Sequence, residues 1–422
     1  MIYFIYDILL LIASVAYLPF YALRGRVHKR IFSRLGFLSP DIQASDGEGK
    51  SAIWIHAVSV GEARAVESLV RLIRGRWPRE RIVVSTVTPT GYAILRKFLK
   101  KDELAFFAPL DISWVVAKFI RALRPRLLLV METELWPNLL RLNAAAGTRI
   151  ILVNGRISDR SFQGYRNLSW FFGPALRKVD LFCMQSEESA RRIRRLAIPQ
   201  DRIRVTGNIK FDLQDDFIEP AFFPKFKDLI GGQILWVCGS THDNEEEAVL
   251  ALYKSLRKDF TNLRLVIAPR HLERLDKIRR LIRVNGLEAA FLSKLNSFSS
   301  AQVALLDTMG DLSAVYSLAD VVFIGGSLVK KGGHNPIEPA VFGKPVLFGP
   351  FMDNFREIRD IFIKEKAAIE VEHSQGLEYE MRRLLASPAE RKALGERGRQ
   401  ILSGHRGATE RTISEIARKA GL

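Results

Sequence analysis

The stretch 319–340 holds the most informative residues of the chain, because a glycine-rich loop there joins an apolar strand-like run to a helix start. Asn335 is a residue type that caps helices, Pro336 suits the first helical position, and Glu338 falls in the first turn. Free backbone N–H groups at such a start attract anions. The stretch therefore predicts a nucleotide-phosphate site, in which Glu338 could take ribose hydroxyls. The alternative is a glycine loop before an ordinary capped helix.

Carboxylates follow two further apolar runs. Glu62 comes directly after Gly61 in H-A-V-S-V-G-E, and Glu132 and Glu134 follow the run 127–131. A carboxylate at a strand end can act as a general base on a hydroxyl when burial raises its pKa. A neighbouring pair can hold a sugar or a cation, or stabilise positive charge at an anomeric carbon. The alternative is that these are ordinary residues of a first helical turn, favoured by the helix dipole. No aspartate pair with supporting histidines follows a strand, so no metal is predicted.

Cationic and small residues mark several more strand ends. Lys210 lies in T-G-N-I-K-F-D, and the small residues 239–241 are suited to an oxyanion. Arg270, in A-P-R-H, could bind a phosphate with two hydrogen bonds. The segment 307–312, D-T-M-G-D-L, is another glycine turn before a helix. Lys210 alone would more often be a solvated surface residue. Four of these sites fall in the second half of the chain, which predicts nucleotide binding there and acceptor binding in the first half.

The elements that must position these residues alternate along the chain. Short β-rich runs are separated by amphipathic segments such as 62–74 and 112–123, a pattern typical of parallel sheets covered on both faces. We therefore expect an α/β protein with two doubly wound, Rossmann-like domains that face a cleft and bind ligands at the carboxyl ends of the strands. The predicted strands are 52–56, 81–86, 126–131, 149–153, 180–184, 202–205, 233–238, 263–268, 302–306, 321–324 and 345–348. The predicted ranges are 25–211 for the first domain, 212–232 for a linker and 233–422 for the second domain.

Charge and the first residues suggest a membrane. The net charge of +18 predicts an anionic partner, whether nucleic acid, anionic lipid or a phosphorylated substrate. Residues 2–23 are almost wholly apolar, with Asp7 as the single charge, and basic residues follow at once. This pattern predicts a membrane-anchor helix at 1–24, with the remaining chain on the cytoplasmic side. Asp7 and Pro19 leave an interfacial helix as the alternative.

Together, these motifs resemble the bacterial Kdo transferases, which move 3-deoxy-D-manno-octulosonic acid (Kdo) from CMP-Kdo to a lipid A precursor. The resemblance runs in order through the whole chain. It implies a GT-B glycosyltransferase of the inner membrane that inverts the anomeric centre and needs neither metal nor cofactor. The matching stretches are H-A-V-S-V-G-E, M-E-T-E-L-W-P-N, G-N-I-K-F-D, G-S-T-H, A-P-R-H, M-G-D-L and G-G-H-N-P-I-E-P-A.

By the same resemblance, Glu62 is the general base that activates the acceptor hydroxyl. Glu132 and Lys210 match the pair that stabilises the transition state. One position departs mildly, since Asp311 stands where a glutamate also appears in relatives. The positions that match CMP contacts are Pro269, Arg270, Met309, Gly310, Asp311, Asn335, Pro336, Ile337 and Glu338.

Two other functions remain open at this point. A related GT-B transferase or epimerase would use a UDP-sugar, and its pocket for the nucleobase would bind UDP in preference to CMP. A membrane-tethered protein that binds anionic lipid or nucleic acid would account for the charge of +18. Basic runs interleaved with aromatic residues are missing from the sequence, which argues against a nucleic-acid partner. An anionic membrane surface remains an expected partner under the Kdo transferase reading.

Overall fold

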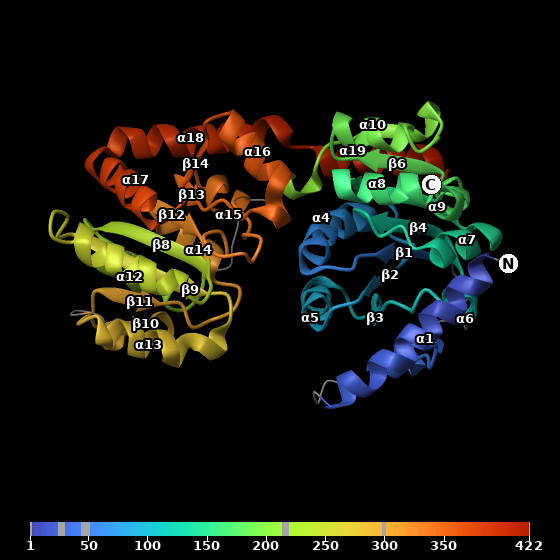
Figure 1. Cartoon of the computed structure of the whole chain (residues 1–422), viewed down its shortest axis with the longest axis horizontal. Coiled ribbons are helices and arrows are strands. Elements are labelled where there is room, and N and C mark those ends of the chain that lie inside the picture. Colours follow the sequence, from blue (N-terminus) through green and yellow to red (C-terminus); the bar gives the residue numbers. More distant parts are fainter. Residues whose placement is uncertain (1, 24–29, 44–50, 213–218, 298–300, 422) are drawn as a thin grey trace. The chain divides into compact units, whose positions relative to one another are not determined.

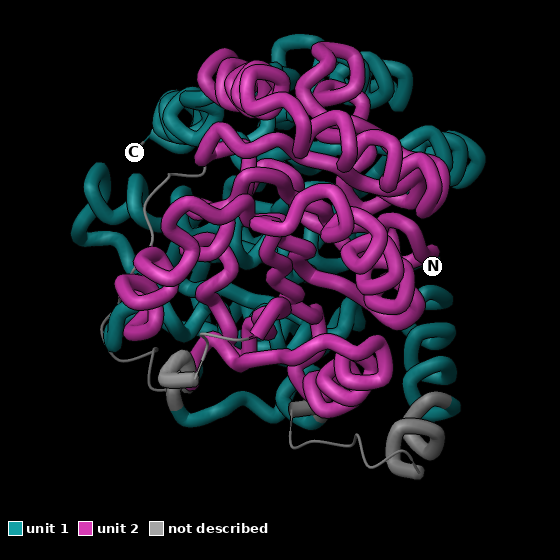
Figure 2. The backbone as a smooth tube through the Cα atoms, turned by 90° about the vertical axis from the view of Figure 1, so that its left-hand side faces the viewer, with its two compact units in different colours: residues 1–212, 406–422 teal, residues 213–405 magenta. Residues whose placement is uncertain are grey.

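Two parallel β-sheets organise the chain, and each lies in a unit of its own (Figure 1). The computed structural model describes residues 2–23, 30–43, 51–212, 219–297 and 301–421. Unit 1 contains residues 1–212 and 406–422, and unit 2 contains residues 213–405 (Figure 2). The predicted α/β class with two Rossmann-like domains is confirmed.

The sheet of unit 1 has seven parallel strands in the order β3-β2-β1-β4-β5-β6-β7. The strands are β1 (Ala52–His56), β2 (Arg81–Thr86), β3 (Leu104–Phe107), β4 (Pro125–Met131), β5 (Arg149–Gly155), β6 (Leu181–Met184) and β7 (Ile203–Val205). The helices are α1 (Ile2–Leu23), α2 (Arg30–Arg34), α3 (Pro40–Gln43), α4 (Val60–Arg76), α5 (Pro89–Phe98), α6 (Ser113–Leu123), α7 (Pro137–Ala145), α8 (Asp159–Asn167), α9 (Ser169–Leu176), α10 (Glu187–Arg194) and α19 (Ala408–Ala420).

The sheet of unit 2 also has seven parallel strands, in the order β10-β11-β9-β8-β12-β13-β14. The strands are β8 (Ile234–Thr241), β9 (Leu263–Pro269), β10 (Ala289–Phe291), β11 (Val303–Leu305), β12 (Val321–Ile324), β13 (Val346–Phe348) and β14 (Ala368–Glu370). The helices are α11 (Phe223–Ile230), α12 (Glu245–Leu256), α13 (Leu275–Val284), α14 (Leu312–Leu318), α15 (Ile337–Val341), α16 (Arg356–Lys364), α17 (Ser374–Ala386) and α18 (Pro388–His405).

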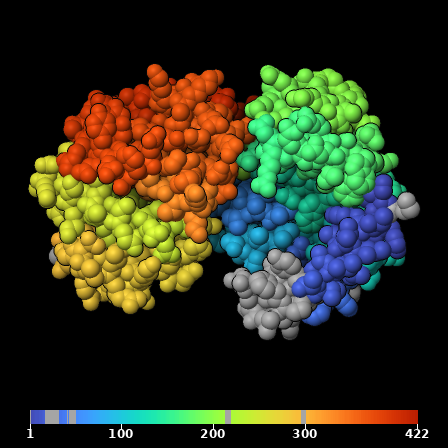
Figure 3. All heavy atoms as spheres, viewed as in Figure 1, coloured from blue at the N-terminus to red at the C-terminus, as the bar shows by residue number. Residues whose placement is uncertain are grey.

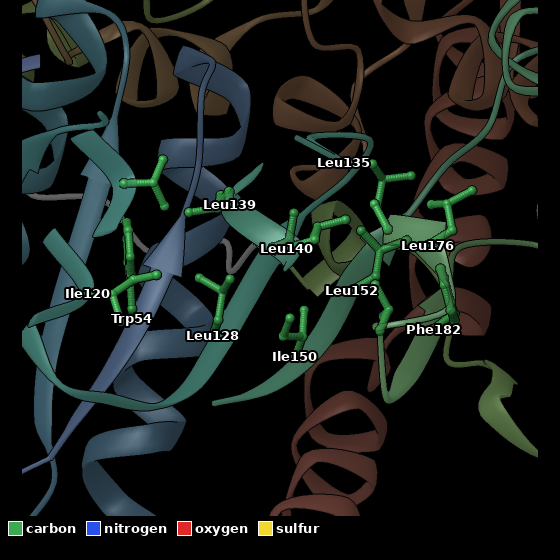
Figure 4. Packing of buried hydrophobic residues seen from close by; sticks show 14 of the residues in the cluster. Trp54, Ile120, Leu128, Leu135, Leu139, Leu140, Ile150, Leu152, Leu176 and Phe182 are labelled. Atoms are coloured by element: carbon green, nitrogen blue, oxygen red, sulfur yellow. The ribbon is translucent and has the colours of Figure 1, made fainter. Parts of the chain in front are cut away.

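Each face of the unit 1 sheet carries its own apolar core. Successive side chains of a strand point to opposite faces, so Trp54 and Leu128 pack on one side while Ile53 and Leu127 pack on the other. Figure 4 shows the first of these clusters, in which residues of β1, β4 and β5 meet those of α6 and α7. Because both faces of the sheet are buried, the side chains on both sides of each central strand must be apolar. The central strands therefore read as continuous apolar runs in the sequence.

The N-terminal transmembrane anchor predicted at residues 1–24, on which the inner-membrane localisation depended, is contradicted by the structure. Within the residues described, no helix is both long and apolar enough to cross a membrane. The charged residue of α1, Asp7, is held by the rest of unit 1, because it is buried and accepts hydrogen bonds from the Ser113 backbone N–H (2.9 Å) and Asn138 Nδ2 (2.8 Å). The hydroxyl of Tyr6 lies 3.2 Å from Asp111 Oδ2. α1 thus packs on the surface of unit 1 (Figures 1 and 3).

The segment predicted as a linker, 212–232, contains the helix α11. Residues 213–218 of that segment fall outside the described residues, as do the basic residues at 24–29 that were expected to follow an anchor. The end of the chain also differs from the predicted range of the second domain, since 406–422 belongs to unit 1. Asp212 explains this placement, because its carboxylate accepts hydrogen bonds from the backbone N–H groups of Gly407 (2.7 Å) and Thr409 (2.6 Å).

Candidate functional site

Glu62 lies at the start of α4, directly after β1. Ser59 caps the helix, and its Oγ accepts a hydrogen bond from the Glu62 backbone N–H (3.2 Å). The Glu62 carboxylate reaches back to the N–H groups of Val58 (2.9 Å) and Ser59 (3.3 Å), which completes a capping box. Glu62 is therefore a first-turn capping residue, and the same contacts hold its carboxylate in one place.

The environment of Glu62 disfavours its charged form. Its side chain is buried, with 4% of its surface exposed. Burial and, after it, the nearby carboxylates of Glu132 and Glu134 raise the pKa of Glu62, the hydrogen bonds from Val58 and Ser59 oppose the shift, and the net value is about 8. A carboxylate with a pKa near the working pH can take a proton from a hydroxyl, which is the property a general base needs.

Glu132 follows β4, the strand that pairs with β1. Its backbone has a φ of +50°, unusual for a residue with a side chain, and its N–H donates to the Val153 carbonyl (2.9 Å). Its carboxylate forms an ion pair with Lys210 Nζ at 2.5 Å, and both side chains are largely buried. Lys210 Nζ also lies 3.9 Å from the place that a Cβ on Gly61 would occupy. The structure thus brings Lys210 and Glu132 together beside the turn that carries Glu62.

Glu134 differs from its neighbour. Its carboxylate accepts a hydrogen bond from Trp136 Nε1 (2.9 Å), and burial raises its pKa despite that bond. Glu134 therefore adds negative charge near Glu62.

Buried amides, which the sequence analysis did not single out, position the Lys210 turn. Asn154 Oδ1 accepts the Ile209 N–H and Asn208 Oδ1 accepts the Lys210 N–H, both at 3.0 Å. Asn208 Nδ2 in turn donates to Gln185 Oε1 (3.1 Å). The available signal was a polar side chain at the end of an apolar strand, as in V-N-G, the last three residues of β5.

The residues predicted to bind CMP all lie in unit 2. Pro269 ends β9, and the N–H of Arg270 donates to the Thr241 carbonyl (3.0 Å) at the end of β8. Met309, Gly310 and Asp311 connect β11 to α14; Met309 is 61% exposed. Gly310 has a φ of +100°, where glycine is favoured. Because β11, β9, β8 and β12 are adjacent in the sheet, the segments after them emerge at the same edge.

The predicted helix start after β12 is shifted. α15 begins at Ile337, so Pro336 precedes the helix, although Asn335 was expected to cap it and Pro336 to begin it. Asn335 Oδ1 still accepts the Ile337 N–H (3.1 Å), and Asn335 Nδ2 lies 3.5 Å from Glu338 Oε1. α15 has only five residues, so its dipole is small. Side chains and loop backbone must therefore supply most of any attraction for an anion.

Glu245 shapes the glycine loop, and the sequence analysis missed it. Its buried carboxylate accepts the N–H groups of Gly326 (2.7 Å) and His242 (2.9 Å) at Oε2, and those of Ser327 (3.1 Å) and Leu328 (3.0 Å) at Oε1. Burial raises the pKa of Glu245, and the four N–H groups oppose that shift. One carboxylate thus ties the loop after β12 to the loop after β8. Its only sequence signal is the first of three glutamates at a helix start.

Comparison with known proteins gives the family. Residues 29–213 match the family described as 3-Deoxy-D-manno-octulosonic-acid transferase (kdotransferase). The 3-deoxy-D-manno-octulosonic acid transferase of Haemophilus influenzae is 32% identical over 419 residues, which cover 97% of each chain. The same-named protein of Chlamydophila psittaci is 29% identical over 423 residues, covering 98% of this chain and 96% of its own.

Solved structures agree on the fold. UDP-GlcNAc 2-epimerase from Neisseria meningitidis, bound to UDP-GlcNAc, has a TM-score of 0.61 at 14% identity, over 87% of this chain and 100% of its own. This likeness concerns the GT-B-like fold alone. The sequence relatives decide the family, because they match over nearly the whole length of both chains. The chain therefore belongs to the Kdo transferase family and is a glycosyltransferase.

Proposed function

We propose that the protein transfers Kdo from CMP-Kdo to a lipid A precursor, in the synthesis of the lipopolysaccharide inner core, with inversion of the anomeric centre. The observation that carries this proposal is the buried Glu62 carboxylate, with its pKa raised to about 8, beside the Glu132–Lys210 ion pair. This arrangement suits a base that works on a hydroxyl near neutral pH. Unit 1 then serves the acceptor, and unit 2 serves the CMP-Kdo donor.

In the proposed reaction, Glu62 takes the proton of the acceptor hydroxyl while that oxygen attacks the anomeric carbon of Kdo. The bond from this carbon to the phosphate oxygen of CMP breaks, and CMP leaves as a phosphate monoester. Attack from the face opposite the leaving group inverts the centre. Glu132 and Lys210 stabilise the charge that develops in the transition state.

CMP is held in this proposal by the segments after four adjacent strands of unit 2. Arg270 contacts the phosphate, and Asn335 to Glu338 contact the nucleotide beside the glycine loop. The remaining contacts are Pro269, Met309, Gly310 and Asp311. All of these residues lie at or after the ends of adjacent strands, along one edge of the sheet, which supports a common role in binding CMP.

The direct test is an incubation of the purified protein with CMP-Kdo and a tetra-acylated lipid A precursor, followed by mass spectrometry. We expect the acceptor mass to rise by one or more Kdo residues, so that successive additions are counted. A parallel titration compares CMP with UDP. Lack of any addition, together with tighter binding of UDP, would replace the proposal with a UDP-sugar enzyme.

The second test is the dependence of kcat/KM on pH when the charge of Glu132 is removed. Because Glu132 raises the pKa of Glu62, Glu132→Gln is expected to lower that pKa. The base is active when deprotonated, so kcat/KM of the wild type should rise with pH and level off above about 8. In Glu132→Gln this rise should move to lower pH, with a lower plateau because a transition-state contact is lost.

Lys210→Met is the paired variant for that measurement. It removes the cation that lies 2.5 Å from Glu132 and leaves the Glu132 charge unopposed. The rise in kcat/KM should then move to higher pH, opposite to the shift in Glu132→Gln. A rise that stays at the same pH in both variants would show that Glu62 does not govern it.

A further inference from the structure

Three histidines of unit 2 meet at the edge of the sheet where the CMP residues lie. His242 follows β8, His271 follows β9, and His334 stands in the loop after β12. The Nε2 atoms of His242 and His334 are 2.9 Å apart, and their rings are nearly parallel, with 6° between the planes. His271 lies edge-on to His242, with ring centroids 5.7 Å apart.

The contact between His242 Nε2 and His334 Nε2 is short enough for a hydrogen bond. Two neutral imidazoles can share such a contact only if one Nε2 donates and the other accepts. If His242 is the donor, its Nδ1 carries no proton in the neutral ring, and one further proton can bind there. Gly326 makes the close approach of both rings to the loop backbone possible, since its φ is +68° and a Cβ there would lie 3.1 Å from His334 and 3.2 Å from His242.

The surroundings of the pair are strongly cationic. Burial and, after it, the nearby side chains of His271, Lys331, Arg274 and Arg270 together lower the pKa of His242 to about 4. Arg274 is paired with Asp243 and Glu246, and Glu245 accepts the His242 backbone N–H. Both histidine side chains are partly exposed. Without an anion, His242 is therefore neutral at pH 7, and an anion that offsets the nearby cations would allow an extra proton to bind to it.

We propose that His242 and His334 form a phosphate subsite that takes up one proton when the nucleotide binds, and that this proton stabilises the departing CMP. The inference rests on the proposed function, because it deepens the assignment of the donor site. In the donor, the phosphate is a diester with one negative charge. When the bond to Kdo breaks, the phosphate becomes a monoester and gains a second negative charge, and the protonated pair offsets that gain. The proton comes from solvent and returns to solvent when CMP dissociates.

The test is a calorimetric titration of the full-length protein with CMP at pH 7.5, in two buffers whose ionisation enthalpies differ. At this pH the phosphate of CMP is mostly a dianion, since its second pKa is about 6. The difference between the two heats counts the protons that bind with the ligand. We expect net proton uptake with CMP, more at pH 7.0 than at pH 7.5, and none with cytidine, which lacks the phosphate.

Variants connect the uptake to the pair. His334→Gln keeps a polar side chain but cannot gain a proton, so it should abolish the uptake and weaken CMP binding about 10- to 100-fold, while cytidine binds as in the wild type. His405→Gln, in the same unit at the end of α18, is the matched control and should change neither quantity.

The outcomes separate this subsite from the function on which it rests. CMP binding without proton uptake in the wild type would overturn the subsite and leave the proposed function intact. Lack of CMP binding altogether would overturn the proposed donor as well. Free Kdo is the third ligand, because its anion is a carboxylate. Uptake with Kdo and not with CMP would overturn the assignment to phosphate.

Discussion

The Glu62→Gln variant is expected to lose transfer activity by a factor of about 10² to 10⁴, the usual contribution of a general base, and to keep its affinity for CMP. Glutamine has nearly the same size as glutamate and can serve at the same position of a capping box, so the start of α4 should be preserved. The amide cannot accept the hydroxyl proton, and catalysis should fail for that reason alone. The measurements are kcat/KM by mass spectrometry of the product and the Kd for CMP by calorimetry.

The same variant should also change how the stability of the protein depends on pH. The pKa of Glu62 is about 8 in the folded state, against an ordinary value of 4.5. Between these two values the folded state binds more protons than the unfolded state, so the stability of the wild type falls as pH rises from 4.5 through 8. Glu62→Gln avoids this loss. It should unfold at a higher temperature than the wild type above pH 8 and at a similar temperature near pH 4.

Glu67→Gln is the matched control, because Glu67 is an exposed residue of the same helix. It should change neither the turnover nor the dependence of stability on pH. Near-normal turnover in Glu62→Gln would remove Glu62 from the role of base. Equal losses in both variants would point instead to an effect on α4 as a whole.

The central strands could be predicted from the sequence, and three edge strands could not. β1, β4, β5, β8 and β9 are buried on both faces, and each reads as a continuous apolar run. β3, β10 and β14 lie at the edges of their sheets, have three or four residues, and lack that signal. Their pairing depends on the neighbouring strand, which local sequence does not record.

The positions of Glu62, Glu132 and Lys210 could likewise be predicted, because each comes after a strand that the sequence predicts. Their environment could not. The ion pair of Glu132 with Lys210 joins residues that are far apart in sequence. Asp7 was the clearest failure, since an apolar helix with one charge reads as a membrane segment until the partners of that charge are known. Asn138 and Ser113, which supply those partners, are more than 100 residues away.

Glu245→Gln is expected to lower the free energy of unfolding by about 2–4 kcal/mol and to weaken CMP binding. The wild-type carboxylate accepts four backbone N–H groups, two at each oxygen. An amide offers one oxygen, and its NH₂ group must face the other two donors. In one orientation the Gly326 and His242 N–H groups lose their acceptor, and in the other orientation Ser327 and Leu328 lose theirs. Either loss removes two of the four hydrogen bonds by which this one side chain holds the glycine loop and the end of β8.

Glu247→Gln tests whether that effect belongs to the carboxylate of Glu245. Glu247 lies on the exposed side of the same first turn of α12, so its replacement should leave urea unfolding and CMP affinity close to those of the wild type. CMP affinity is measured without urea, at a temperature at which all three proteins are folded. Weaker CMP binding under those conditions reflects the geometry of the loop and not unfolding. If Glu245→Gln matched Glu247→Gln in both measurements, the glycine loop would be held by its own backbone, and Glu245 would not position the donor site.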